Sequence, residues 1–300
     1  MNKARSWLSA MRLRTLPLSV SGVILGTCLA YYNGAFNWGV FILALLVTVS
    51  LQILSNLAND YGDGVKGTDN HDRQGPQRAI QSGAISPDEM LEALKINILI
   101  IIFLVLGLLF FAFGFTNFIY VLIFVILGGL SVYAAINYTM GDSPYGYRAM
   151  GDLFVFIFFG LLSVMGTYFL NMKQLDHVLL LPSVSLGLLS VAVLNLNNMR
   201  DIESDQKAGK ITLAVKLGIK KAKRYHFALV GGAMLCALLF FVLYYTGPYN
   251  ALFLIAFIPF SLHLKVVYQS KESAPLDKQL KVLALSTFLF SCLLGIGYIL

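Results

Sequence analysis

Long apolar runs, separated by short polar stretches, constrain the fold of this chain more than any other feature of its sequence. Of its 300 residues, 58% are hydrophobic and only 12% are charged, and the mean hydropathy is +0.75. Helices that are apolar on every face need lipid or other helices around them. The sequence therefore predicts an all-α integral membrane protein in a lipid bilayer, and it excludes an ordinary soluble globular domain.

Nine apolar runs approach or exceed the roughly 20 residues that cross the hydrocarbon core of a bilayer. The predicted spans lie near residues 16–33, 38–59, 95–115, 117–138, 152–171, 178–199, 226–246, 250–269 and 281–299. No soluble domain or low-complexity linker interrupts them, which predicts a single transmembrane domain over residues 1–300. The first run lacks a small-residue cleavage site, so we interpret it as a retained helix rather than a signal peptide.

The 22 lysines and arginines fall almost entirely on one side of this nine-span arrangement, and Lys173 alone lies on the other. Cytoplasmic loops carry the excess of basic residues in membrane proteins. We therefore predict a cytoplasmic N-terminus, cytoplasmic large loops and an external C-terminus. Because the net charge of +7 is first a signal of topology, we expect no binding of nucleic acid.

Two clusters of Asn and Asp residues end the second and the sixth predicted spans. Each begins with Asn-x-x-x-Asp and has a further carboxylate about one turn later. The clusters comprise Asn56, Asp60 and Asp63 in the first and Asn197, Asp201 and Asp205 in the second. At these spacings the side chains of a cluster share one face of a helix. Carboxylates at the membrane ends of helices are costly and usually functional.

The clusters have the chemistry of a site for an isoprenoid diphosphate. Carboxylate and amide oxygens are the ligands that Mg²⁺ prefers, and Mg²⁺ often bridges a protein to substrate phosphates. A diphosphate neutralised by Mg²⁺ and by lysine and arginine is a good leaving group, and its apolar chain fits between membrane helices. The alternative, that these residues only cap helices and solvate loops, explains one aspartate better than two matched clusters.

The clusters resemble the aspartate-rich motifs NxxxDxxxD and DxxxD of the UbiA superfamily of intramembrane aromatic prenyltransferases. The second cluster matches fully. The first departs by one position, because Gly64 stands in the fourth place after Asp60. Two candidates for the third motif residue remain, Asp63 and Asp69. The resemblance implies a UbiA-type bundle of nine transmembrane helices.

Two longer stretches resemble the branch of this superfamily that acts on 1,4-dihydroxy-2-naphthoate. They are GPQRAIQSGAIS at residues 75–86 and SPYGYRAMGDLFVFIFFG at residues 143–160. The resemblance implies transfer of a polyprenyl group from polyprenyl diphosphate to this acceptor, with loss of CO₂ and diphosphate, giving demethylmenaquinone in menaquinone synthesis. It also implies a bacterial or archaeal cytoplasmic membrane, and we infer no obligate protein partner.

Carried onto this chain, the resemblance predicts Mg²⁺ as the cofactor and six residues that hold it together with the diphosphate. These are Asn56, Asp60, Asp63, Asn197, Asp201 and Asp205, of which the four aspartates are the expected catalytic carboxylates. Arg78 stands where family members carry an arginine after the first motif, so we expect it to bind the diphosphate. Three lysines are further candidates, although loop lysines commonly serve only solvation and topology: Lys66, Lys207 and Lys210.

The loop between the fourth and fifth predicted spans supplies three more candidates. Its length and Gly and Pro content suit a mobile cover over the site. The ring of Tyr147 suits an allylic cation, and the guanidinium of Arg148 suits the carboxylate of the acceptor. Asp152 is a candidate catalytic carboxylate. Alternatively, tyrosines at a membrane interface are anchors, and Asp152 caps the fifth span.

Two other functions fit parts of the sequence. A prenyltransferase for another aromatic acceptor, such as 4-hydroxybenzoate, shares the motifs, but the two longer stretches argue against it. A secondary transporter would also place carboxylates in membrane helices. Transporters usually build their coupling sites near the bilayer midplane on broken helices, whereas both clusters here lie at one membrane face.

Overall fold

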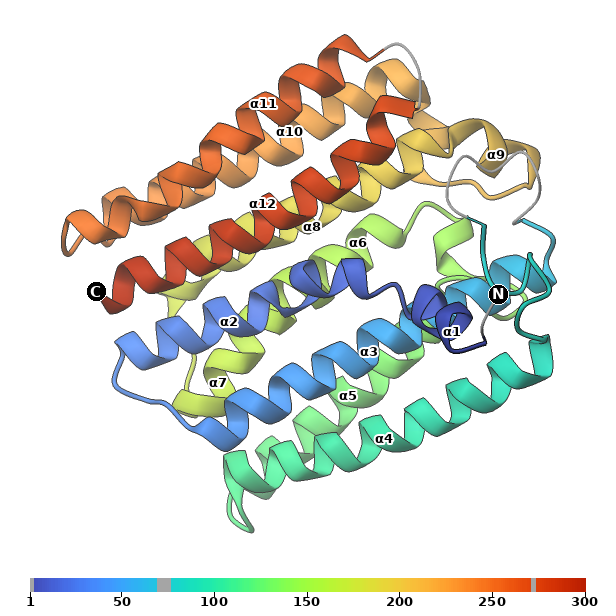
Figure 1. Ribbon diagram of the computed structural model, residues 1–300. Helices are drawn as coiled ribbons and strands as arrows, with labels where there is room; N and C mark the ends of the chain where they lie inside the picture. Colours follow the sequence, from blue (N-terminus) through green and yellow to red (C-terminus); the bar gives the residue numbers. More distant parts are fainter. Residues whose placement is uncertain (1–2, 69–76, 271–273) are drawn as a thin grey trace.

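The computed structural model describes residues 3–68, 77–270 and 274–300, and these residues form helices joined by loops (Figure 1). The N-terminal part contains α1 (Lys3–Met11), η1 (Leu13–Thr15), α2 (Leu16–Tyr32), α3 (Trp38–Val65), α4 (Pro87–Phe113) and α5 (Phe118–Asn137). The middle part contains η2 (Tyr145–Tyr147), α6 (Gly151–Val155), the π-helix η3 (Phe156–Gly166), α7 (Thr167–Met172), η4 (His177–Leu179) and α8 (Leu180–Arg200). The C-terminal part contains α9 (Ile202–Lys207), α10 (Leu213–Leu243), η5 (Pro248–Ala256), α11 (Phe257–Gln269) and α12 (Ala274–Ile299).

Nine helical segments in the described part of the chain are long and apolar enough to cross a membrane, as the sequence predicts. Their ends differ from the predicted spans on the side that carries most of the charge. Helix α3 continues to Val65 rather than ending near residue 59, and α10 begins at Leu213 rather than near residue 226, with a break in its helical backbone at Gly218 (φ 69°). Hydropathy marks the thickness of the hydrocarbon core, whereas a helix continues into the polar region as long as its backbone hydrogen bonds persist. The extension of α3 keeps the first aspartate cluster on one helical face.

Polar side chains define where two of the long helices begin. Asn37 accepts hydrogen bonds from the backbone N–H groups of Gly39 and Val40 and so caps α3. Ser86 and Glu89 form a reciprocal capping box at the start of α4. Such caps satisfy backbone donors that have no partner within the helix.

The helices form two groups that flank an internal cavity. Helices α8, α10, α11 and α12 lie together, and α2 to α5 with α7 lie beside them (Figure 1). Helix α12 packs against both α2 and α8, and η3 packs against α2 and α8. The last of these contacts is very close, since a Cβ atom on Gly160 would lie 2.5 Å from the Cα atom of Gly187. Small residues permit this approach between membrane helices.

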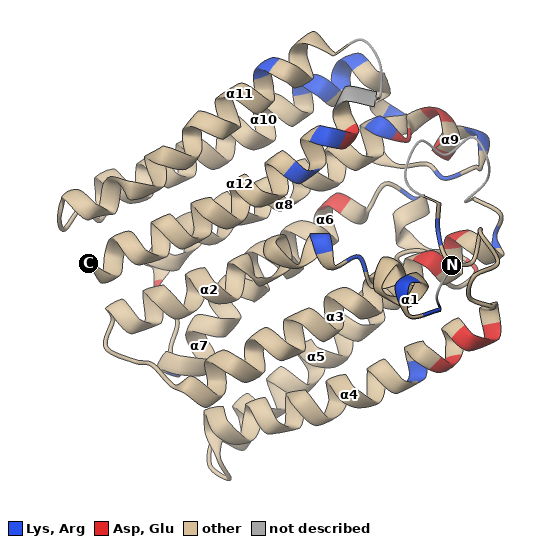
Figure 2. Cartoon of the chain, in the orientation of Figure 1, with Lys and Arg blue, Asp and Glu red and all other residues tan. Residues whose placement is uncertain are grey.

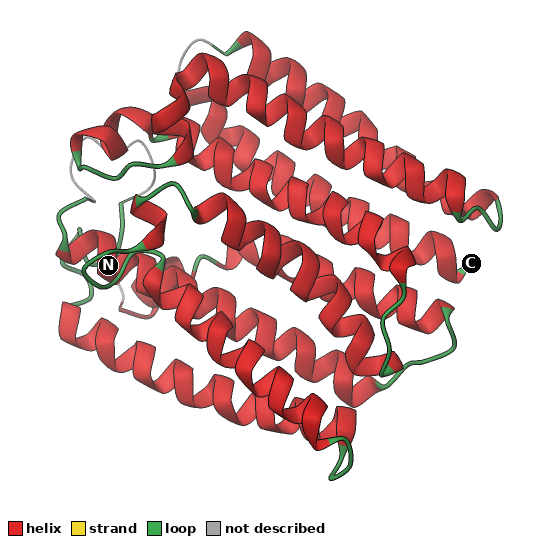
Figure 3. Cartoon of the chain, turned by 180° about the vertical axis from the view of Figure 1, so that it is seen from behind, coloured by secondary structure: helices red, strands yellow, loops and turns green. Residues whose placement is uncertain are grey.

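Charged residues gather at the end of the bundle where the N-terminus lies, and the C-terminus lies at the opposite end (Figure 2). The view from behind shows the same long helices lying side by side, with their axes roughly aligned (Figure 3). The sides of α4 and α5 expose large apolar side chains, including Phe103, Phe118 and Ile119. This distribution suits a bundle with lipid along its sides and water at its ends.

Candidate active site

A cavity of about 720 Å³ runs from the charged end of the bundle into its apolar interior. Asp60, Asp63 and Arg78 are among the residues that line its polar end. Its interior is lined by α2, α3, α4, α5, η3 and α8, which contribute residues such as Phe124 and Phe158. The cavity therefore joins an ionic end to an apolar chamber.

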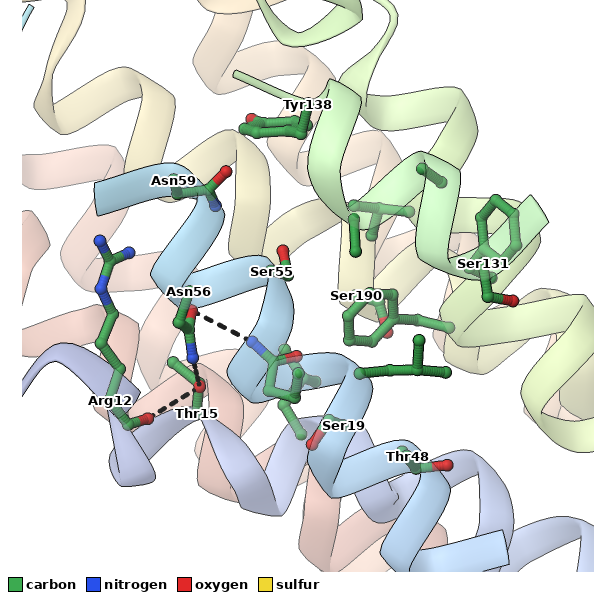
Figure 4. Close-up of a pocket in the computed structure, with 18 of the residues that line it drawn as sticks. Arg12, Thr15, Ser19, Thr48, Ser55, Asn56, Asn59, Ser131, Tyr138 and Ser190 are labelled. Carbon is green, nitrogen blue, oxygen red and sulfur yellow. Dashed lines mark hydrogen bonds between the residues drawn. The ribbon is translucent and has the colours of Figure 1, made fainter. Parts of the chain in front are cut away.

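Three serines of the cavity wall have their hydroxyls satisfied within their own helices. Ser19, Ser131 and Ser190 lie around the chamber (Figure 4), and each donates its hydroxyl to a backbone carbonyl of its own helix. A hydroxyl that is satisfied in this way needs no hydrogen bond from a ligand. The chamber therefore suits a long apolar chain.

Asp63 is the centre of the ionic end and is only 1% exposed. Its carboxylate accepts hydrogen bonds from the hydroxyl of Tyr147 at 2.8 Å and from Nζ of Lys210 at 3.3 Å. The guanidinium of Arg78 lies 3.3 Å from the same carboxylate. Three groups from three separate loops thus converge on one residue of α3. A buried carboxylate requires such partners.

Lys210 remains charged although it is buried. Burial opposes its charge, but the carboxylates of Asp63 and Asp205 outweigh burial and raise the pKa of Lys210 above its ordinary value. Its ammonium lies 5.4 Å from the centre of the Tyr147 ring. Burial, and then the charge of Asp63, raise the pKa of the Tyr147 hydroxyl, which therefore stays a proton donor.

Hydrogen bonds hold the loop after α5 in place at this end of the cavity. Tyr147 accepts a hydrogen bond at its backbone carbonyl from the N–H group of Ile211 at 3.3 Å. Lys66 donates to the carbonyls of Thr139 and Gly141, both at 2.8 Å. Lys66 therefore braces the loop, and the structure does not bring it to the cavity lining.

The other two residues of the first cluster tie neighbouring segments to α3. Asp60 accepts hydrogen bonds from the backbone N–H groups of Ala79 at 3.1 Å and Ile80 at 3.3 Å. Asn56 donates to Oγ1 of Thr15 at 3.3 Å (Figure 4) and so joins α3 to the start of α2. Both residues are buried and line the cavity.

The second cluster is organised by Arg200, which the sequence analysis used only for topology. Its guanidinium donates two hydrogen bonds to Asp201, at 2.8 and 2.6 Å, and one at 2.6 Å to Asp277 of α12. A fourth, at 3.0 Å, goes to Asn197. The signal in the sequence was an arginine inside a cluster of acidic residues at a helix end.

The structure brings only part of the predicted set to the cavity. The predicted residues that line it are Asn56, Asp60, Asp63, Arg78, Asn197 and Lys210. Asp201 and Asp205 lie beside it, and Asp205 approaches Lys210 at 3.9 Å. Tyr147 reaches the site through its bond to Asp63.

Three predicted residues lie elsewhere. Arg148 and Lys207 are exposed and do not line the cavity. Asp152 is buried away from the lining and accepts a hydrogen bond from the hydroxyl of Tyr225 at 2.9 Å. Asp69, the alternative third residue of the first motif, lies outside the described residues. Charged cavity residues that the sequence did not single out for the site are Arg12, Arg14, Arg200, Asp277 and Lys281.

The donor set has the chemistry that Mg²⁺ requires. Asp60 and Asp63 on α3 and Asn197 on α8 present oxygen atoms to one cavity from two helices, and hard divalent cations prefer oxygen ligands. Among the described residues, no three His, Cys, Asp or Glu side chains are grouped closely enough to hold a metal ion by themselves. A bound metal ion would therefore need amide oxygens and substrate oxygens as ligands. It would also need carboxylates that are paired with basic side chains in this structure.

The fold and the cavity together define a helical membrane protein whose cavity is ionic at one end and apolar inside. Residues 19–296 match the model of the UbiA prenyltransferase family, and the chain belongs to this family. The predicted resemblance and the helical membrane fold are therefore confirmed.

Relatives of known name cover most of the chain. The 1,4-dihydroxy-2-naphthoate octaprenyltransferase of Escherichia coli (strain K12) is 47% identical over 85% of this chain and 82% of its own length. The protein of the same name from Haemophilus influenzae is 41% identical over 98% of this chain and 96% of its own length. A UbiA homolog from Archaeoglobus fulgidus, whose structure was solved bound to GPP and Mg²⁺, has a TM-score of 0.61 at 14% identity, covering 95% of this chain and 99% of its own. At that identity the structure supports the fold alone.

Proposed function

We propose that this chain transfers a polyprenyl group from polyprenyl diphosphate to 1,4-dihydroxy-2-naphthoate in menaquinone synthesis. The bond between the prenyl C1 atom and the diphosphate oxygen breaks, and diphosphate leaves with the electron pair. A carbon of the aromatic ring forms the new bond to C1, and the carboxylate departs as CO₂. The product is demethylmenaquinone in its hydroquinone form. The names of the relatives that are 47% and 41% identical support the acceptor.

One observation carries the proposal: a single cavity joins the ionic group around Asp63 to an apolar chamber inside the bundle. We expect Arg78 and Lys210 to hold the diphosphate. Both cations line the cavity, and each lies 3.3 Å from the carboxylate of Asp63 at its ionic end. The apolar chamber holds the prenyl chain and keeps water from the allylic centre.

We further propose that Mg²⁺ is held with the diphosphate by Asn56, Asp60, Asp63, Asn197, Asp201 and Asp205. The ion would neutralise charge on the leaving diphosphate. The Archaeoglobus fulgidus homolog bound to GPP and Mg²⁺ supports this cofactor. Tyr147 keeps its proton and orients Asp63 through the hydrogen bond of 2.8 Å.

The proposed surroundings are the cytoplasmic membrane of a bacterium or archaeon, with the N-terminus and the site on the cytoplasmic side and the C-terminus outside. The gathering of lysine and arginine at the end of the bundle that holds the site supports this orientation (Figure 2), because basic residues mark the cytoplasmic side. Cytoplasmic substrates would then reach the ionic end of the cavity directly.

The test uses the purified full chain in detergent with Mg²⁺, a polyprenyl diphosphate and either 1,4-dihydroxy-2-naphthoate or 4-hydroxybenzoate. We expect a prenylated, decarboxylated product from the naphthoate, detected by mass, and no product after addition of EDTA. A product from 4-hydroxybenzoate alone would keep the reaction type and replace the acceptor. No product from either, in folded protein, would favour other acceptors and then the transporter.

A further inference from the structure

The cavity carries more cationic side chains than one diphosphate site uses. Its basic residues are Arg12, Arg14, Arg78, Arg200, Lys210 and Lys281. Two of them, Arg78 and Lys210, converge on Asp63. The proposed reaction has a second anionic reactant, because the naphthoate carries a carboxylate. A second cationic subsite in the same cavity would match it.

Lys281 lies on the face of α12 that forms part of the cavity wall. It follows Asp277 by four residues, so the two share a helical face, and Leu280 beside it also lines the cavity. Asp277 fixes this face against the end of α8 through its contact with Arg200 at 2.6 Å. One turn of helix rises about 5.4 Å, which sets Lys281 deeper in the bundle than the Asp277–Arg200 pair.

The ammonium of Lys281 differs from the other cations of the cavity wall whose partners are described above. Within the described part of the chain it has no hydrogen-bond or ion-pair partner. Arg200, in contrast, is held by Asp201 and Asp277, and Lys210 is held by Asp63. The Lys281 side chain is exposed, so an anion that enters the cavity can reach its ammonium.

Apolar side chains of the two helices α8 and α12 line the same cavity as Lys281. Helix α8 continues the cavity lining from Asn197 toward the middle of the membrane with Leu194 and Val193, and α12 contributes Leu280. Helices α8 and α12 pack against each other. Apolar side chains from two helices with one monovalent cation are the elements that an aromatic monocarboxylate requires.

We propose that Lys281 binds the carboxylate of the aromatic acceptor, which lies along α8 and α12, while Asp63, Arg78 and Lys210 serve the diphosphate. This inference rests on the proposed function. It assigns to Lys281 the role that the sequence suggested for Arg148; both side chains are exposed, but Lys281 lines the cavity and Arg148 does not.

The first test compares Lys281→Gln with Lys281→Arg and with Lys278→Gln in the full chain. Lys278 is exposed on the same helix and does not line the cavity. For Lys281→Gln we expect the KM for 1,4-dihydroxy-2-naphthoate to rise by about 10-fold or more, the typical effect of losing a charged hydrogen bond. The KM for polyprenyl diphosphate should stay within about twofold. The arginine variant should recover most of the affinity, and Lys278→Gln should behave as the parent.

A second test measures binding without turnover, by the thermal shift of the full chain with 1,4-dihydroxy-2-naphthoate or with 1,4-dihydroxynaphthalene, which lacks the carboxylate. The parent should prefer the naphthoate, and Lys281→Gln should lose that preference. An unchanged KM and preference would make Lys281 an interfacial anchor and overturn the inference, as would a rise confined to the diphosphate KM. If the parent prenylates only 4-hydroxybenzoate, the proposed acceptor fails, and the same comparison with 4-hydroxybenzoate and phenol still tests Lys281.

Discussion

The two aspartate clusters share a sequence pattern but differ in the partners that hold them. On α3, the carboxylates of Asp60 and Asp63 are held by segments remote in sequence. Asp60 accepts hydrogen bonds from the backbone N–H groups of the two residues that follow residue 78. Asp63 accepts hydrogen bonds from Tyr147 and Lys210, which lie in two other loops. The first cluster therefore gathers the loops over the mouth of the cavity.

The second cluster is held locally and by another membrane helix. Asp201 pairs with Arg200, its neighbour in sequence, and the same guanidinium reaches Asp277 of α12. This cluster therefore joins α8 to α12. A repeated motif therefore need not have repeated surroundings. One cluster organises loops around an anion site, and the other joins two helices at the edge of that site, where its oxygen atoms are proposed Mg²⁺ ligands.

The largest expected effect is at the centre of the first cluster. Asp63→Asn removes the charge that Arg78 and Lys210 share, and we expect kcat to fall by about 10³-fold, the usual scale for a charge-stabilising group in an active site. Mass-detected turnover measures the change. Asp88→Asn, on the exposed first turn of α4, is the matched control and should keep parental activity. Near-parental turnover of Asp63→Asn in folded protein would remove Asp63 from the site.

The second prediction separates the two regions by stability. Arg200→Gln leaves Asp201 and Asp277 without their cation, and breaking a buried pair costs about 3 kcal/mol of the free energy of unfolding. Arg78→Gln, in contrast, should change thermal stability less, because Asp63 keeps Tyr147 and Lys210 as partners, and it should raise the KM for polyprenyl diphosphate by about 10-fold. Thermal unfolding in detergent and steady-state kinetics measure both variants, with the exposed Arg224→Gln as the control. Equal losses of stability would contradict the contrast between the regions.

The sequence predicted the membrane fold well because its signals are physical requirements. A bilayer demands about 20 apolar residues per span, so the nine runs could be counted directly and their number is confirmed. The aspartate clusters could be placed on helical faces from their spacing alone. The exact helix ends were wrong, as at Val65 of α3, because hydropathy does not report where a helix stops in the polar region.

The composition of the site was harder to predict because it depends on tertiary contacts. Arg200 and Lys281 lie in stretches that read as topology signals, and only the packing of α12 against α8 brings Asp277 to Arg200. Two predicted site residues in the loop after α5 also differ in whether they reach the site. Tyr147 meets Asp63, while its neighbour Arg148 faces outward. A loop residue's direction depends on backbone turns that composition does not encode.

A smaller effect is expected for the hydroxyl that links the loop to the first cluster. Tyr147→Phe keeps the ring near Lys210 but removes the hydrogen bond to Asp63, and we expect kcat/KM to fall by about 10-fold, as for a hydrogen bond to a charged group. Tyr133→Phe, on the exposed side of α5, is the control. If both variants keep parental kinetics, the loop does not organise Asp63 through this hydroxyl.

The smallest effect is expected at Arg148, and it tests whether the loop contributes an anion site of its own. Because the guanidinium is exposed and outside the cavity lining, Arg148→Ala should leave the KM values for both substrates within about twofold, as for an ordinary surface substitution. The rise in the naphthoate KM for Lys281→Gln, measured in the same assay, shows how large the effect of losing a carboxylate contact is. A rise in the naphthoate KM for Arg148→Ala that matches Lys281→Gln would mean that the loop turns Arg148 inward when the acceptor binds. The loop over the first cluster would then contribute to both anion sites, and Lys281 would no longer be the only cation assigned to the acceptor.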